Sequence, residues 1–158
     1  MQIITEAHKQ FLVSLVEMNV DFLLIGGYAV IYHGYPRLTM DMDIWLKPDN
    51  GNKLKLLQAL RSYGIVKEDL EKIKNSDFTK PLAFYIGEKK NKIDFLTVIA
   101  GVKFDEADAK KVFLHINNIK IPVIDYNDLV VNKMIVGRPQ DKADVDMLQK
   151  VQRAKNRR

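Results

Sequence analysis

The chain has no cysteine, so disulfide bonds and thiolate metal sites are excluded. No apolar run approaches the roughly 18 residues that a membrane-spanning helix needs. The first residues also lack the basic-then-apolar layout of a secretory signal peptide. Hydrophobic residues make up 47% and charged residues 28% of the 158 positions, which is typical of a globular rather than a disordered protein. We therefore expect a soluble, cytoplasmic protein with no membrane contact.

Several familiar catalytic patterns are missing as well. The chain contains no Gly-x-Gly-x-x-Gly fingerprint, no Walker lysine loop and no nucleophile elbow. Its three histidines, His8, His33 and His115, stand far apart in the sequence, so they do not predict a histidine metal site. Packing or helix capping is the simpler interpretation of His33, which directly precedes Gly34.

The net charge of +5 comes from one end of the chain. Without residues 150–158, acidic and basic residues are equal in number. We predict one domain over residues 1–149 and a basic C-terminal tail over residues 150–158. Such a tail can attract nucleic acid, although a solvated helix end is the commoner origin of such charge. The basic residues of the tail are Lys150, Arg153, Lys155, Arg157 and Arg158.

Hydrophobic periodicity indicates interleaved helices and strands. The class is therefore α/β (α+β), with a mixed central sheet flanked by helices. A turn is expected over 48–51, and residues 67–80 are assigned only to loop or irregular helix. On the helix at 53–63, Leu54, Leu57 and Leu60 are expected to share one face. The predicted helices are 5–19, 28–33, 53–63, 126–136 and 141–153; the predicted strands are 21–25, 40–46, 82–86, 92–98, 112–116 and 119–123, with hairpin turns at 87–91 and 117–118.

The predicted strand at 40–46 carries two aspartates. Residues two apart on a strand point to the same face, so Asp41 and Asp43 should project side by side. Trp45 is expected to face away from them, in the core. Adjacent carboxylates repel each other and raise each other's proton affinity, a cost that a divalent cation relieves.

A third acid, Asp94, lies among apolar residues on another predicted strand. If the two strands are neighbours, three carboxylates converge, and such a cluster can hold two Mg²⁺ ions for an in-line phosphoryl displacement. Alternatively, Asp41 and Asp43 lie on a solvated strand end and Asp94 is a separate surface acid. The residues alone leave both interpretations open.

A glycine pair, Gly26-Gly27, separates a predicted strand from a short helix. Two glycines there let the backbone approach a ligand closely and leave amides free for a phosphate, although a tight turn needs them equally. The order is strand, glycine pair, helix, loop, and then a strand that carries Asp-x-Asp.

Gly26-Gly27, thirteen intervening residues and Asp41-Met42-Asp43-Ile44 together resemble the nucleotidyltransferase superfamily of the polymerase-β type. Asp94 is similar to the third acid of that superfamily. The fuller string from Gly26 to Ile44, with Gly-Tyr-Ala, His-Gly and Arg-x-Thr before Asp-x-Asp, resembles small bacterial proteins of the AbiEii toxin group.

The C-terminal part is similar to the same group, in which a lysine precedes an Arg-x-x-Asp-x-x-Asp helix start. Here Lys133 is followed by Arg138, Asp141 and Asp144. The group usually has lysine where this chain has Gln140, so a basic contact at that position is not predicted.

The resemblance implies transfer of a nucleoside monophosphate from a nucleoside triphosphate (NTP) to a hydroxyl, with release of pyrophosphate. Asp41, Asp43 and Asp94 would bind Mg²⁺ or Mn²⁺, and Asp94 would also help to deprotonate the hydroxyl. Nucleotide binding would fall to Gly26, Gly27, Arg37, Thr39 and Lys133. For Arg37, a plain loop charge is an equal alternative. Lys133 is better explained by pairing with Asp141 or Asp144, and Asp141 by the dipole of its helix.

The acceptor could be RNA, a protein or a small molecule, and the basic tail slightly favours RNA. A different class is also open: a non-catalytic binding module, such as one component of a toxin–antitoxin pair. A phosphohydrolase is disfavoured because no histidine accompanies the acids.

Overall fold

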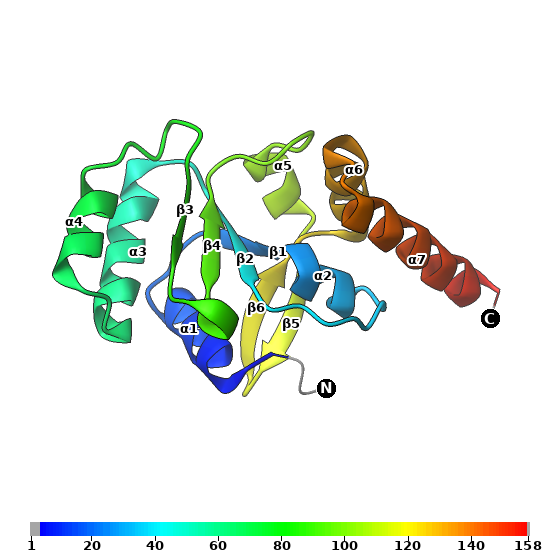
Figure 1. The fold of residues 1–158 in the computed structure, drawn as a ribbon, viewed down its shortest axis with the longest axis horizontal. Coiled ribbons are helices and arrows are strands. Elements are labelled where there is room, and N and C mark those ends of the chain that lie inside the picture. The colour runs from blue at the N-terminus through cyan, green and yellow to red at the C-terminus, as the bar shows by residue number, and fades with distance from the viewer. Residues whose placement is uncertain (1–3, 158) are drawn as a thin grey trace.

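The computed structural model describes residues 4–157; residues 1–3 and Arg158, the last residue of the predicted basic tail, lie outside it. Six strands form one mixed sheet in the order β3-β4-β2-β1-β6-β5 (Figure 1). The pairs β2–β4 and β1–β6 are parallel, and the other three neighbouring pairs are antiparallel. The strands are β1 (Phe22–Ile25), β2 (Met42–Leu46), β3 (Ala83–Ile86), β4 (Ile93–Leu96), β5 (Val112–Ile116) and β6 (Ile119–Val123).

Helices cover both faces of the sheet. In Figure 1, α1, α3 and α4 lie on one side and α2, α5 and α6 on the other, while α7 extends away from the body. This is the mixed sheet flanked by helices that the sequence predicts. The helices are α1 (Glu6–Glu17), α2 (Gly26–Tyr32), α3 (Asn50–Tyr63), α4 (Lys67–Lys74), α5 (Phe104–Ala109), α6 (Tyr126–Val136) and α7 (Pro139–Asn156), with a 3-10 turn at Lys89–Asn91.

The centre of the sheet is packed with large apolar side chains. Met42, Ile44 and Phe95 are completely buried on the face that meets α1, where the Phe11 ring lies 6.0 Å from the Phe95 ring. Such dense packing fixes the two central strands rigidly. The opposite face of the same strands carries the aspartates.

Both predicted hairpins are confirmed. At the β5–β6 turn, Asn117 and Asn118 adopt positive φ angles of 49° and 70°, the conformation that a two-residue turn between twisted strands requires. Gly87 has a φ of 76° at the start of the β3–β4 connection.

Trp45 and the start of α3 differ from expectation. Trp45 shares the face of Asp43, yet it is buried because Phe104 of α5 covers it and its indole N–H donates to the Thr97 carbonyl. The expected turn over 48–51 is instead the beginning of α3, with Asp49 capping it through the Asn52 amide.

The apolar face of α3 is rotated from the predicted one. Leu54 is 59% exposed, whereas Leu56, Leu57 and Leu60 are buried. The short helices α4 and α5 were not predicted as such, because charged residues fill most of α4 and α5 is only six residues long.

Within residues 4–157, no helix is both long enough and apolar enough to cross a membrane.

Asn52 joins α3 to the ends of the central strands β1 and β2 and provides a test of the fold. Its buried side chain accepts from the Asp21 amide at 2.8 Å and donates to the carbonyls of Asp21 and Lys47 at 2.8 and 3.2 Å. Asn52→Ala leaves the Asp21 amide without its acceptor, whereas the two carbonyls keep the backbone donors Lys47 and Asp49. We therefore expect a loss of about 1–3 kcal/mol in the free energy of unfolding, measured with urea. Gln58→Ala, at an exposed position of the same helix, should change it by less than about 0.5 kcal/mol. Equal effects of the two substitutions would contradict this role.

Candidate active site

Three aspartates meet at one end of the central strands. Asp43 on β2 is paired directly with Asp94 on the parallel strand β4, and with Ile25 at the end of β1. Asp41 directly precedes β2 and lies two residues before Asp43. The strand of Asp94 therefore lies beside the acidic strand, which is the backbone arrangement that the metal hypothesis requires.

Asp43 is the most strongly perturbed of the three. Burial and the repulsion of Asp94 and Asp41 raise its pKa to about 6, against the opposing effect of Lys133 and Arg138. In the described part of the chain, no donor hydrogen-bonds to its carboxylate. A partly buried carboxylate without a donor is a feature that a bound cation would satisfy.

The glycine pair makes room for the polar groups around Asp43. Gly26 has a φ of 67°, and a Cβ atom there would overlap the Asp43 carboxylate. A Cβ atom on Gly27 would overlap the Thr39 hydroxyl, which lies 3.3 Å from the Asp41 carbonyl oxygen that accepts its hydrogen bond. Both positions require glycine, because the chain segments that carry the acids pass directly against the backbone.

A lysine lies between two of the acids. The Lys92 ammonium nitrogen is 3.3 Å from Asp94 Oδ1 and 3.9 Å from Asp41 Oδ2. Within residues 4–157, no three His, Asp or Glu side chains are close enough, as arranged, to hold one metal ion together. The donor chemistry suits a hard divalent cation, but all three carboxylates can share one only after side chains rotate.

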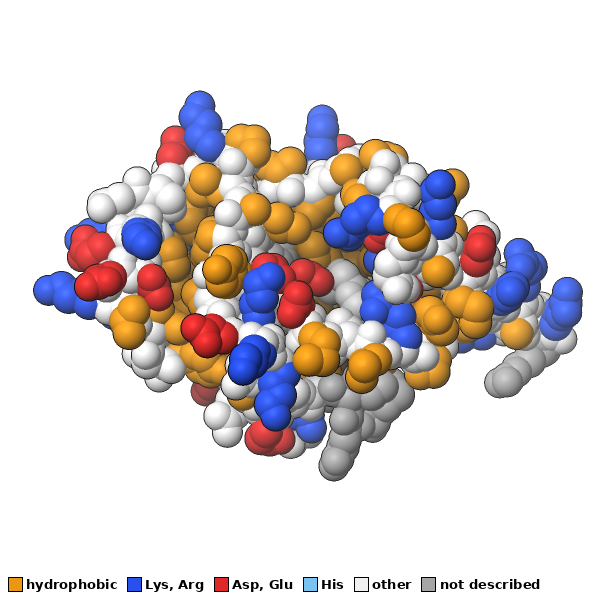
Figure 2. All heavy atoms as spheres, viewed as in Figure 1, with side chains coloured by type: hydrophobic (Ala, Val, Ile, Leu, Met, Phe, Trp, Pro, Cys, Tyr) orange, Lys and Arg blue, Asp and Glu red, His pale blue; other side chains and the backbone are white. Residues whose placement is uncertain are grey.

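A cleft runs across Gly26 and Asp43 and has two parts, each of about 340 Å³. One part is polar and reaches Arg37, Thr39 and Gln140; the other has apolar walls that include Leu96, Val98 and Val136. Figure 2 shows acidic side chains gathered near the centre of this face, with basic side chains close by. The two parts share Gly26, Asp43, Lys133, Arg138 and Asp141.

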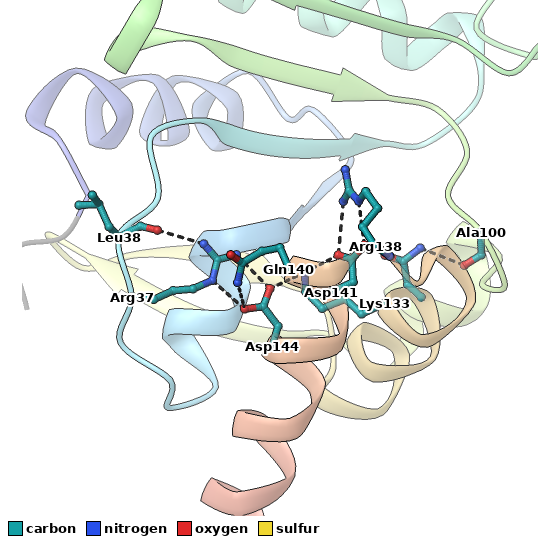
Figure 3. A network of polar contacts seen from close by, with 9 residues as sticks. Arg37, Leu38, Ala100, Lys133, Arg138, Gln140, Asp141 and Asp144 are labelled. Atoms are coloured by element: carbon teal, nitrogen blue, oxygen red, sulfur yellow. Dashed lines mark hydrogen bonds and ion pairs between the residues drawn. The ribbon is translucent and has the colours of Figure 1, made fainter.

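The cationic wall of the cleft is built on two buried acids of α7 (Figure 3). Arg37 donates to both oxygens of Asp144, at 2.8 and 3.0 Å. Lys133 lies 2.9 Å from Asp144 and 3.2 Å from Asp141. Burial alone would raise the pKa of Asp144, but hydrogen bonds from Arg37 and Lys133 outweigh it and hold the pKa below the usual range.

The preferred interpretation of Lys133, as a partner of Asp141 and Asp144, is therefore confirmed, and Arg37 is more than a plain loop charge. Gln140 joins the same network by donating to Asp144 at 2.9 Å. Arg37 and Lys133 both line the cleft. The carboxylates of α7 therefore fix their positions, while their positive charge lies next to the site.

Arg138 is the cleft residue that sequence reasoning missed. Its guanidinium donates to Asp141 at 2.7 Å, yet its side chain is 74% exposed, far more than those of Arg37 and Lys133. Arg138 is the first residue of the Arg-x-x-Asp-x-x-Asp motif, and this position in the sequence could have identified it as a cleft residue. Asp141 also accepts from the Arg138 amide and so caps α7, in agreement with the helix-dipole interpretation.

The tail residues continue α7. Residues 150–156 are helical, and a Cβ atom on Gly34 would lie 2.8 Å from a methyl group of Val151. Lys150, Arg153 and Lys155 are exposed or partly exposed along this extension. The segment is therefore an ordered basic helix rather than an unstructured appendage over these residues.

No protein-family model and no curated protein matches this sequence. Among solved structures, the fold is similar to that of a Thermotoga maritima protein provisionally described as a nucleotidyltransferase. The TM-score is 0.51 at 15% sequence identity, over 95% of this chain and 91% of the other. The chain therefore has a nucleotidyltransferase fold over nearly its whole length, and at this identity the likeness concerns the fold alone.

The raised pKa of Asp43 predicts a pH-dependent effect of Asp43→Asn. The folded-state pKa of about 6 exceeds the ordinary aspartate pKa of 3.8, so the wild-type fold loses stability as the pH rises through this interval. The side-chain amide of the Asp43→Asn variant does not titrate, so the variant does not lose stability in this way. Relative to wild type, Asp43→Asn should therefore gain about 2 kcal/mol between about pH 4 and pH 8, measured by urea denaturation. Asp146→Asn, at an exposed position of α7, is the control. If the difference in free energy of unfolding between wild type and Asp43→Asn is the same at both pH values, the pKa of Asp43 is not raised.

Proposed function

We propose that this chain is a metal-dependent nucleotidyltransferase that moves a nucleoside monophosphate from an NTP to a hydroxyl acceptor and releases pyrophosphate. The observation that carries the proposal is the arrangement at Asp43: an unpaired carboxylate of raised pKa, packed on a glycine pair and flanked by Asp41 and Asp94. The nucleotidyltransferase fold supports it. The AbiEii-like grouping and a toxin–antitoxin partner are finer proposals that rest on sequence resemblance.

The three aspartates would hold Mg²⁺ or Mn²⁺. When bound, the metal would neutralise charge on the phosphates and activate the attacking oxygen. Asp43 fits this role because no donor among residues 4–157 satisfies it, and Asp41 and Asp94 would join after rotation. Asp94 would also take the proton of the acceptor hydroxyl.

The triphosphate would lie in the polar part of the cleft. Gly26 and Gly27 present bare backbone there, and Thr39 adds a hydroxyl. Arg37 and Lys133 supply positive charge that Asp144 and Asp141 hold in place. The exposed guanidinium of Arg138 is the best placed of the three cations to contact a phosphate directly, because most of its surface is free.

The acceptor would approach over the open side of the cleft. RNA is favoured among RNA, protein and small molecules, because α7 carries exposed basic residues at its end. The direct test incubates the protein with Mg²⁺, labelled NTPs and total cellular RNA or protein. Labelling of a macromolecule by wild type and not by Asp43→Asn supports the proposal. If neither fraction is labelled with any NTP, transfer to a macromolecule is refuted.

A second candidate, a non-catalytic nucleotide-binding module, is favoured by one observation. Lys92 already offsets part of the negative charge of Asp41 and Asp94, which leaves these acids less available to a metal. The two candidates differ in whether nucleotide binding requires a divalent cation.

Ligand-induced stabilisation distinguishes them. A ligand that binds only the native state at about 100 times its Kd adds about 2.7 kcal/mol, so Mg²⁺ with an NTP should raise the Tm by several degrees. Asp43→Asn should abolish this shift, and Asp146→Asn should retain it. Differential scanning fluorimetry provides the measurement. A full shift with NTP and EDTA would favour the non-catalytic module, and an unchanged shift in Asp43→Asn would place the nucleotide elsewhere.

A further inference from the structure

Lys92 is held on the same face of the sheet as the acids. It lies two residues before Asp94, and its ammonium nitrogen contacts Asp94 and Asp41 at 3.3 and 3.9 Å. The same nitrogen lies 4.9 Å from the centre of the Tyr85 ring, on the neighbouring strand β3. One positive group therefore spans two carboxylates that belong to different strands.

The Lys92 ammonium is placed as a counter-ion to the acidic cluster. Asp41, Asp43 and Asp94 repel one another, and Lys92 is the cation that contacts two of them. Asp43 lacks such a partner and has the raised pKa.

The contact can be released. The Lys92 side chain is 32% exposed and sits on a flexible four-carbon stem, so the ammonium can move into solvent without repacking the core. Partly exposed ion pairs of this kind contribute little to stability. A divalent cation carries twice the charge and binds carboxylate oxygens more strongly than an ammonium does.

We propose that Lys92 is an internal counter-cation that occupies the acidic site in the metal-free protein and is displaced when a divalent ion binds. It is a positioning residue: it contacts Asp41 and Asp94 until the metal arrives, and it sets the affinity of the site for that metal. The inference rests on the proposed function, because it assumes that the three acids bind a metal.

The test is titration of the full chain with Mn²⁺ alone, followed by calorimetry. Lys92→Met removes the ammonium and retains the apolar stem. With no ammonium to displace, this variant should bind Mn²⁺ about threefold to thirtyfold more tightly than wild type. Lys90→Met, an exposed lysine in the adjacent turn, is the matched control and should bind as wild type does. Lys92→Arg keeps the charge and should bind no more tightly than wild type.

The outcomes separate the two proposals. In the first outcome, wild type binds Mn²⁺ and Asp43→Asn does not, but Lys92→Met binds Mn²⁺ no more tightly than wild type. That result would overturn the role of Lys92 and leave the proposed function intact. Absence of Mn²⁺ binding by wild type and Lys92→Met alike, with and without an NTP, would overturn both. Tighter binding by Lys92→Met but equally by Lys90→Met would reduce the effect to general surface charge and refute the inference. If Lys92→Met fails to fold by circular dichroism, Lys92→Gln takes its place under the same criteria.

Discussion

Repulsion among three carboxylates on one face of two paired strands is the constraint around which this end of the molecule is organised. β2 and β4 are locked by completely buried side chains on the opposite face, so Asp43 and Asp94 cannot separate by movement of the backbone. The repulsion is therefore met locally: Lys92 contacts two of the acids, and proton affinity rises on Asp43. Carboxylates that repel one another, with too few donors or cations to offset the repulsion, are suited to bind a metal cation.

Unlike the three clustered acids, each cation of the cleft has a carboxylate partner, which α7 supplies. Asp144 and Asp141 are buried on α7 and hold Arg37, Lys133 and Arg138 at the edge of the site. Removing Asp144 would leave the largely buried Arg37 guanidinium without its carboxylate partner, which is far more costly than losing a surface ion pair. The network also joins the loop before β2 to the last helix, although these segments are a hundred residues apart in the sequence. Under the proposed function, phosphate binding would therefore depend on α7 as well as on the glycine pair.

Local sequence rules account for much of the fold and part of the site. The hairpin at Asn117-Asn118 and the strand that carries Asp94 follow from turn chemistry and alternation, and both are present. The rotated face of α3 was missed, because packing buries Leu56 instead of Leu54. The burial of Trp45 was predicted, but its face was not: it shares the face of Asp43, where Phe104 of α5 covers the indole. The role of Asp144 and the position of Lys92 between two acids arise from tertiary contacts, which no spacing in the chain reveals.

The central claim is that the acidic face at Asp43 binds a divalent cation together with a nucleotide. The most direct measurement is a crystal structure with Mn²⁺ and a non-hydrolysable NTP, in which anomalous scattering locates the metal independently of interpretation. The account predicts a manganese peak at about 2–2.6 Å from the Asp43 carboxylate, with the triphosphate beside Gly26 and the Lys92 ammonium moved away from Asp41. Nucleotide bound elsewhere, or bound at the cleft with no manganese at Asp43, would contradict it.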